Sequence, residues 1–146
     1  MQHQETGCQA VEVPECSAAS PSPPAWWPVR PAQELVDDLA KAKLMGHLGR
    51  ELSKLGRIDL LVLDELGYMD LTKDSATLFF QLVSRRYERG SIILNTNRPF
   101  EEWGSLFKDN IIATAILDRL LHHSLVFYIT GKSYRLKNHN SGIVDK

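Results

Sequence analysis

The stretch IDLLVLDE, residues 58–65, carries four consecutive aliphatic side chains, Leu60 to Leu63, followed directly by two acids. An aliphatic run without alternation predicts a strand that is buried on both faces, as in the centre of a parallel sheet. Asp64 and Glu65 then fall at the carboxyl end of that strand. Ligands of open α/β sheets bind beyond the carboxyl ends of the strands, so this position favours a functional site.

Helical and strand patterns alternate along the chain around this strand. Apolar side chains at helical spacing predict a helix over residues 33–55, which Gly46 and Gly49 weaken and can divide into two helices. The pattern continues with helix 74–89, strand 91–96 (SIILNT), helix 110–122 and strand 124–130 (SLVFYIT). This order predicts crossover connections and a mostly parallel sheet, so the fold class is α/β.

The first 31 residues differ in composition from the rest. They hold six of the seven prolines, both cysteines and two of the three tryptophans. Proline removes backbone donors and disfavours the helical region for the preceding residue, so we predict a disordered tail over 1–31. The domain follows over 32–137, and a flexible C-terminus over 138–146. Cys8 and Cys16 form no metal-binding spacing, so we predict free thiols.

The overall composition is that of a soluble globular protein. Of 146 residues, 17 are Lys or Arg and 18 are Asp or Glu, so the formal net charge is -1 and charge alone indicates no nucleic-acid or membrane partner. No apolar run approaches the ~20 residues of a membrane span, and the N-terminus lacks the pattern of a signal peptide. We therefore expect a cytoplasmic protein without a membrane partner.

The acids at the end of strand 58–65 match the Walker B pattern of nucleotide-binding proteins. There, Asp64 would hold Mg²⁺ through water, and Glu65 would orient and polarise an attacking water. An ordinary cap of the next turn is the alternative. At the end of the next strand stand Asn95, Thr96 and Asn97, where a polar side chain could sense a γ-phosphate; the alternative is a turn before Pro99.

Three longer segments resemble one known family. They are LLVLDELGYMDL, ATLFFQLVSRRYERGSIILNTNRPFEEWGSLF and ATAILDRLLHHSLVFYITGKSYRLK. From about Ala32 to about Lys137 the chain resembles the IstB-like helper ATPases of insertion sequences, which are AAA+ proteins related to the replicative-helicase loader. The resemblance implies a P-loop NTPase three-layer sandwich that binds ATP and Mg²⁺. It also implies binding to DNA with little sequence preference, self-association in a ring or filament, and assistance to a transposase.

The same resemblance implies roles for individual residues. Asp64 corresponds to the Mg²⁺-associated Walker B acid and Glu65 to the catalytic glutamate. Asn97 corresponds to the sensor residue beside the γ-phosphate, with Thr96 as the substitute and a nucleotide contact. Arg119 corresponds to the arginine finger, whose planar charged group reaches the ATP of a neighbouring subunit. A surface ion pair is the alternative for Arg119.

The family's phosphate-binding loop is missing from the pattern. No G-x-x-x-x-G-K-[ST] occurs in the 146 residues, and the GKS at 131–133 has Val126 where the first glycine is required, so it reads as a turn. The family's first strand, which lies between its fourth and fifth, is missing too. Strand 124–130 is therefore expected either to pair with 91–96 or to leave the domain only partly stable. We expect a truncated or frame-disrupted gene, a tail of unrelated origin, and weak or absent ATP binding.

Basic residues and histidines give further candidates. Arg85, Arg86 and Arg89 form a basic stripe that could contact DNA phosphates, with a solvated helix face as the alternative. His122 and His123 are adjacent, and on a helix they would diverge by about 100°, which predicts no shared metal ion.

Two other classes of function stay open at this point. The first is a non-catalytic remnant that packs on intact subunits through the face around Arg119. The second is a Mg²⁺-dependent phosphoesterase that combines Asp64 and Glu65 with Asp70 or Asp74. The second requires several acids around two metal ions, and no other strand ends in an acid.

Overall fold

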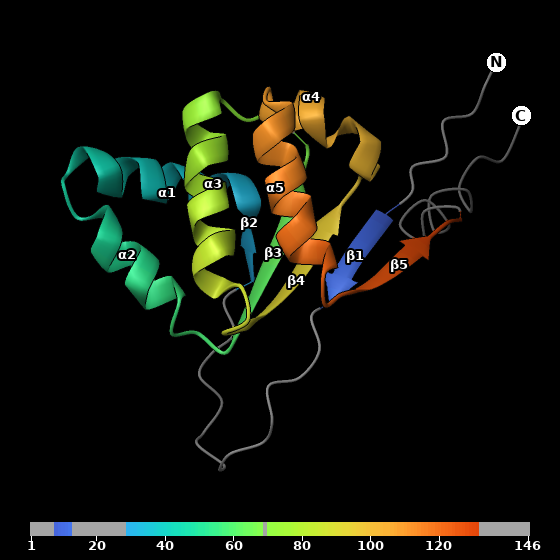
Figure 1. The fold of residues 1–146 in the computed structure, drawn as a ribbon, viewed down its shortest axis with the longest axis horizontal. Helices are drawn as coiled ribbons and strands as arrows, with labels where there is room; N and C mark the ends of the chain where they lie inside the picture. The colour runs from blue at the N-terminus through green and yellow to red at the C-terminus, as the bar shows by residue number, and fades with distance from the viewer. Residues whose placement is uncertain (1–7, 13–28, 69, 132–146) are drawn as a thin grey trace, which may run out of the picture.

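The computed structural model describes residues 8–12, 29–68 and 70–131. From Ala32 onward, their helices and strands alternate as the sequence predicts (Figure 1). The elements are β1 (Cys8–Glu12), β2 (Val29–Pro31), α1 (Ala32–Leu44), α2 (Leu48–Leu55), β3 (Leu60–Leu66), α3 (Lys73–Arg86), β4 (Ser91–Thr96), the 3-10 helix η1 (Phe100–Glu102), α4 (Trp103–Phe107), α5 (Asn110–Leu121) and β5 (Leu125–Ile129).

Within the described ranges, the sheet has five strands in the order β2-β3-β4-β1-β5. Strands β2, β3 and β4 are parallel neighbours, and β1 is antiparallel to both β4 and β5. Because β1 runs against both of its neighbours, β5 points in the same direction as β4. The predicted α/β class with a mostly parallel sheet is confirmed.

Strand β1 lies where the family's first strand was expected to be missing. It pairs Gln9 with Thr96 of β4 on one side and with Tyr128 of β5 on the other. The prediction of a tail without regular structure is therefore wrong for Cys8–Glu12 and for Val29–Pro31. Direct pairing of the last strand with 91–96, one of the two expected alternatives, does not occur. The physical reason is that β4 and β5 both need hydrogen-bond partners, which the proline-free segment CQAVE supplies.

The helices of the described residues form one layer on one face of the sheet (Figure 1). The chain passes through β2, β3, β4 and β5 in a single direction across the sheet. Right-handed crossovers then put all the connecting helices on the same side. These residues thus form two of the three layers that the family fold implies. None of their helices has the length and apolarity that a membrane span requires.

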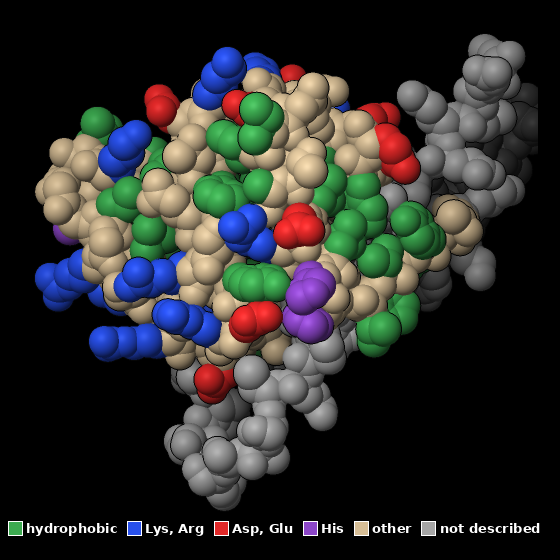
Figure 2. Space-filling view, viewed as in Figure 1, with side chains coloured by type: hydrophobic (Ala, Val, Ile, Leu, Met, Phe, Trp, Pro, Cys, Tyr) green, Lys and Arg blue, Asp and Glu red, His purple; other side chains and the backbone are tan. Residues whose placement is uncertain are grey.

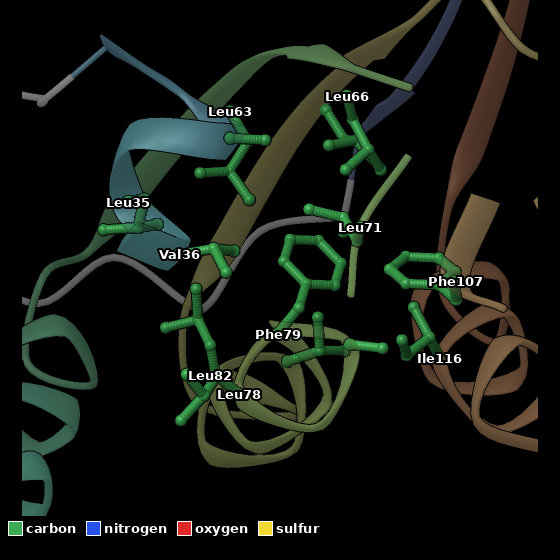
Figure 3. Packing of buried hydrophobic residues seen from close by; sticks show 14 of the residues in the cluster. Leu35, Val36, Leu63, Leu66, Leu71, Leu78, Phe79, Leu82, Phe107 and Ile116 are labelled. Carbon is green, nitrogen blue, oxygen red and sulfur yellow. The ribbon is translucent and has the colours of Figure 1, made fainter. Parts of the chain in front are cut away.

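The core fills the space between this helical layer and the sheet (Figure 3). Alternate residues of β3, Leu61 and Leu63, are fully buried beneath the helices, whereas Val62 is only half-buried on the opposite face. The rings of Phe79 on α3 and Phe107 on α4 stack with centroids 5.6 Å apart. Each such buried side chain contributes about 1.5–3 kcal/mol to folding, and together they hold β3 and its terminal acids in place.

The boundaries of two predicted helices shift for local reasons. The helix predicted over 33–55 divides at Gly46, whose φ of 76° is left-handed, whereas Gly49 lies inside α2. The helix predicted over 74–89 ends at Arg86, because Tyr87 leaves the helical region and Glu88 has a left-handed φ of 58°. The chain then turns directly into β4.

Candidate functional site

The carboxyl ends of β3 and β4 bring Asp64 beside Asn95. The register pairs Leu63 with Leu94, so the next residues of the two parallel strands are neighbours. Asn95 Nδ2 donates a hydrogen bond of 2.7 Å to Asp64 Oδ1, and the backbone N–H of Glu65 donates another of 2.9 Å to the same oxygen. Both bonds use Oδ1, which leaves Oδ2 as the oxygen available to a water or a cation.

Glu65 follows in an unusual conformation. Its φ is 59°, which is left-handed, and the pairing of β3 with β4 shifts register between Leu63 and Leu66. Holding a non-glycine residue there costs on the order of 1–3 kcal/mol, and such residues concentrate at functional sites. The shift leaves the side chain exposed. It lines a cavity of about 100 Å³ with Gln33 and Tyr68.

The polar residues at the end of β4 have different environments. Thr96 is buried; its hydroxyl donates to the Leu66 carbonyl at 2.7 Å and accepts from the Arg98 N–H at 3.1 Å. Asn97 is exposed at the same edge of the sheet. The residue that contacts Asp64 is Asn95, to which the sequence pattern assigned no role of its own. The alternation of side chains along a strand could have indicated this residue. Leu94 and Thr96 are buried on one face of β4, so Asn95, which lies between them, points to the other face.

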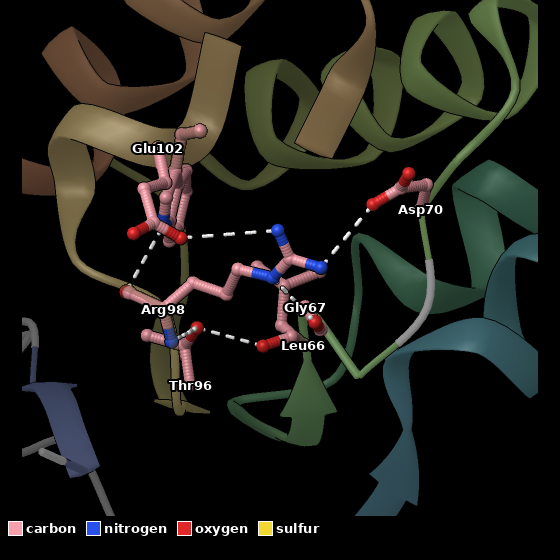
Figure 4. A network of polar contacts seen from close by, with 7 residues as sticks. Leu66, Gly67, Asp70, Thr96, Arg98 and Glu102 are labelled. Carbon is pink, nitrogen blue, oxygen red and sulfur yellow. Dashed lines mark hydrogen bonds and ion pairs between the residues drawn. The ribbon is translucent and has the colours of Figure 1, made fainter. Parts of the chain in front are cut away.

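Arg98 joins the two loops that follow these strands (Figure 4). Its Nε donates to the Gly67 carbonyl at 2.9 Å, and its terminal nitrogens pair with Asp70 at 3.3 Å and with Glu102 at 3.8 Å. The loop after Glu65 is therefore fixed to the loop after β4. Asp70 is used in this network, which does not support the phosphoesterase alternative.

Asp74, the other acid of that alternative, is also directed elsewhere. It is highly exposed and pairs with Lys43 of α1 at 3.7 Å. In the described part of the chain, therefore, Asp64 and Glu65 are not joined by the further acids that two metal ions would need.

Arg119 lies toward the amino ends of the parallel strands, whereas Asp64 lies at their carboxyl ends. Helix α5 starts after the loop beyond β4 and runs back to the start of β5, so its last turn is near the amino ends of the parallel strands (Figure 1). The guanidinium lies over the ring of Phe80, 4.8 Å from its centroid, and Nη1 donates to the Ala115 carbonyl at 2.9 Å. Arg119 does not reach Asp64 of its own chain.

Arg86 is not a surface residue, and its prediction as a DNA contact is wrong. It is fully buried, and its guanidinium donates to the carbonyls of Leu55, Ile58, Asp59 and Ser91. Burial lowers the pKa of the Arg86 guanidinium, an effect that the carboxylate of Asp59 opposes. The side chain satisfies carbonyls at the ends of three elements, which is a structural role.

The other two arginines of the stripe are exposed. Arg85 donates to Ser53 Oγ at 2.8 Å, which places it next to α2. Blue side chains gather over α2 and the lower end of α3 in Figure 2. The exposed bases on α2, on the last turn of α3 and on the turns after these helices are Arg50, Lys54, Arg57, Arg85 and Arg89. We call this group the α2–α3 basic patch.

The fold and the site define a class of protein. Parallel strands that carry helices on one face, with an acid at the end of the middle strand of the three parallel neighbours, form part of a P-loop NTPase-like α/β fold. The family model of the IstB-like ATP binding protein matches residues 29–142. The chain therefore belongs to the IstB-like family of insertion-sequence proteins.

Individual relatives agree with this assignment. The chain is 48% identical over 117 residues to the "Insertion sequence IS21 putative ATP-binding protein" of Pseudomonas aeruginosa, a match that covers 80% of this chain. It is 45% identical to the counterpart from IS5376 of Geobacillus stearothermophilus, over 73% of this chain. With the counterpart from IS232 of Bacillus thuringiensis subsp. berliner it shares 44% identity, over 74% of this chain.

The matches cover less than half of each relative. They span 44%, 42% and 43% of the lengths of the IS21, IS5376 and IS232 proteins. The described structure thus represents one part of the proteins that it resembles.

Proposed function

We propose that this chain carries the metal-binding and water-activating side of an ATPase that assists an insertion-sequence transposase. The observation that carries the proposal is the contact of Asn95 with Asp64 at the carboxyl ends of two parallel strands. The names of the relatives, which describe ATP-binding proteins of insertion sequences, support the same chemistry.

The residues at this edge suit Mg²⁺. The ion prefers oxygen ligands and commonly binds through one or two carboxylates, water and nucleotide phosphates. Asp64 offers Oδ2 while Asn95 and the Glu65 N–H hold Oδ1. Mg²⁺, when bound with ATP, would neutralise charge on the phosphates. In this proposal the exposed carboxylate of Glu65 accepts a proton from the attacking water and orients it.

The two polar residues after Asn95 take different parts in the proposal. Asn97 is exposed at the edge and is suited to contact a γ-phosphate as the sensor. Thr96 is buried and hydrogen-bonded to Leu66 and Arg98, so it supports the loop conformation and is less suited to touch the nucleotide. To these residues we add Asn95, whose side chain donates to Asp64 and is suited to orient its carboxylate.

Binding of the phosphates needs backbone N–H groups and a lysine, which the P-loop pattern supplies. The 146 residues hold no such pattern. We therefore propose that this chain alone binds ATP weakly or not at all. Arg119, directed away from its own Asp64, would act on the ATP of a neighbouring subunit in a self-associated assembly. Arg85 and Arg89 of the α2–α3 basic patch would contact DNA phosphates.

The nucleotide proposal is tested by titrating the chain with a fluorescent ATP analogue in the presence of Mg²⁺. We expect no saturable binding in the low micromolar range. Binding in that range that disappears in Asp64→Ala would contradict the impairment and support the site. Binding that Asp64→Ala leaves unchanged would contradict the site itself.

A non-catalytic interaction with intact subunits is the second candidate function. The position of Arg119 favours it, since the guanidinium packs on Phe80 at a half-buried surface remote from Asp64. We expect the chain to co-purify with the full-length IS21 relative, and Arg119→Ala to weaken this association. Arg30→Ala is the matched control, because Arg30 is on β2, the outer strand at the opposite side of the sheet from β5. Equal recovery of wild-type chain and Arg119→Ala would contradict a role for Arg119.

The DNA proposal is tested by the salt dependence of DNA binding. For each phosphate that the protein no longer neutralises, the slope of log affinity against log salt falls by about one. We expect Arg85→Gln with Arg89→Gln to lower the slope by about two, and Lys108→Gln, after α4, to leave it unchanged. An unchanged slope in the double variant would contradict a role for these arginines at DNA.

A further inference from the structure

The turn after α3 and the turn after α5 lie side by side near the amino ends of the parallel strands, at the opposite end from Asp64. Both helices run against the parallel strands and pack on each other, so both end at this edge. Tyr87 and Glu88 leave α3 here, and His122 and His123 leave α5. His122 and His123 are both exposed, and Figure 2 shows histidine side chains on the surface close to acidic ones.

These side chains converge on one point. Glu88, His122 and His123 each offer one ligand atom, and the three atoms all lie within 4.8 Å of one another. His123 Nε2 is 3.7 Å from Glu88 Oε1, and the two imidazole rings have centroids 4.0 Å apart. The expectation that the histidines diverge is wrong: His122 keeps helical backbone angles at the end of α5, yet the two rings lie side by side.

A neighbouring side chain holds one of these histidines, and the backbone conformation positions the glutamate. The Tyr87 hydroxyl and His122 Nδ1 are hydrogen-bonded at 2.7 Å. A histidine that binds a metal through one ring nitrogen usually has the other fixed by such a partner. Glu88 has a left-handed φ of 58°, and this conformation directs the turn of the chain next to α5.

We propose that Glu88, His122 and His123 bind one divalent transition-metal ion of the zinc class. Two imidazole nitrogens and one carboxylate oxygen are ligands that Zn²⁺ accepts, whereas Mg²⁺ and Ca²⁺ prefer oxygen alone. All three residues are exposed, so the fourth position of a tetrahedral ion is open to water.

The bound ion would fix the last turn of α5 to the turn between α3 and β4. Arg119 lies four residues before His123, on the same end of the helix. The metal would therefore restrain the end of α5 that presents Arg119. The site itself does not depend on the proposed nucleotide chemistry, which takes place at the other edge of the sheet.

The test is a Zn²⁺ titration of the full 146-residue chain in competition with a chromophoric chelator. Any polyhistidine tag is removed, and Cys8→Ser with Cys16→Ser forms the background, because thiols bind zinc. We expect one Zn²⁺ per chain, and no binding of Mg²⁺ or Ca²⁺ at the same site. Co²⁺ in place of Zn²⁺ should give the visible absorption of a four-coordinate ion.

Three variants decide whether these residues are the ligands. Glu88→Gly removes the carboxylate and suits the left-handed backbone, and His123→Gln removes one imidazole; each should weaken Zn²⁺ binding about tenfold or more. His47→Gln, an exposed histidine between α1 and α2, should leave it unchanged. Absence of stoichiometric binding, or binding in Glu88→Gly and His123→Gln as tight as in the parent chain, would overturn the proposal.

Discussion

Asn95 donates a hydrogen bond of 2.7 Å to the carboxylate of Asp64, across the two central parallel strands. The bond fixes the acid that the Walker B pattern singles out, and it comes from the residue two positions before the expected sensor. Removal of the donor leaves one carboxylate oxygen with only the Glu65 N–H. Orientation of Asp64 therefore depends on β4 as well as on β3.

Asn95→Ala should lower the free energy of unfolding by about 1–3 kcal/mol, because the hydrogen bond to an ionised group is removed. Urea denaturation measures the change. Asn97→Ala is the control; its side chain is exposed, so its effect should stay within about 0.5 kcal/mol. Equal effects of the two substitutions would contradict the structural difference between them.

Arg86→Met should destabilise the protein strongly, by about 3–5 kcal/mol, since four backbone carbonyls lose their charged donor inside the protein. The midpoint of urea unfolding reports this loss. Arg89→Met, three residues further on, removes an exposed charge and should change stability by less than about 0.5 kcal/mol. A mild effect of Arg86→Met would show that water replaces the guanidinium.

Gly90→Ala should destabilise the protein by about 1–3 kcal/mol through overpacking. A Cβ at Gly90 would lie 2.7 Å from Arg86 Nη2 and 3.1 Å from the Ile58 carbonyl oxygen, so it would disturb the same set of hydrogen bonds. Gly49→Ala in α2 is the matched comparison, because no atom lies within 4 Å of its added Cβ. That change should stabilise the helix by up to about 1 kcal/mol. Thermal unfolding of both variants checks the opposite signs.

Acid should remove the contribution of the Arg30–Asp38 ion pair to the free energy of unfolding. This pair joins β2 to α1, with 2.6 Å between Arg30 Nη2 and Asp38 Oδ2. The hydrogen bond from Arg30 lowers the pKa of Asp38 below its ordinary value of 3.8. The pair therefore stabilises the fold above that value, and its contribution is lost as the pH falls through the lower pKa of the folded state.

Asp38→Asn should accordingly reduce stability at pH 7 but change it little at pH 2. The loss at pH 7 should stay below about 1 kcal/mol, because both side chains are partly exposed. Urea unfolding at the two pH values and low salt measures it, because a neutral denaturant does not screen the pair, with Asp37→Asn as the charge-matched control. A loss that is equal at both pH values would show that the carboxylate's charge is not responsible.

The sequence could predict the elements better than the contacts between them. The aliphatic run before Asp64 is a local signal, and it was sufficient for the strand and the position of the acid. The predicted burial of both faces is wrong, because only the face beneath the helices, with Leu61 and Leu63, is fully buried. The contact of Asn95 with Asp64 depends on the register of two strands, which no local pattern carries. Arg85 and Arg86 look alike in a helical pattern, yet one is exposed and the other is buried beneath three chain segments.

The group of Glu88, His122 and His123 at the end of α5 is a second case in which a local sequence pattern did not predict the contacts between elements. The spacing of adjacent residues on a helix predicted that the side chains of His122 and His123 diverge. His122 keeps helical backbone angles, yet the ring centroids of His122 and His123 lie 4.0 Å apart. Glu88 is brought close only by the left-handed turn after α3, a conformation that its residue type does not favour.

Strand β1 has a consequence for how the chain folds. Its partners are Ile93–Thr96 of β4 and Leu125–Ile129 of β5. A strand from the start of the sequence therefore lies between two strands from its second half. Contacts between distant segments form late, because the loop that joins them must first be closed. The parallel strands β2 to β4 and their helices can assemble without β1. We expect its insertion between β4 and β5 to complete the sheet and to be the slowest step of folding.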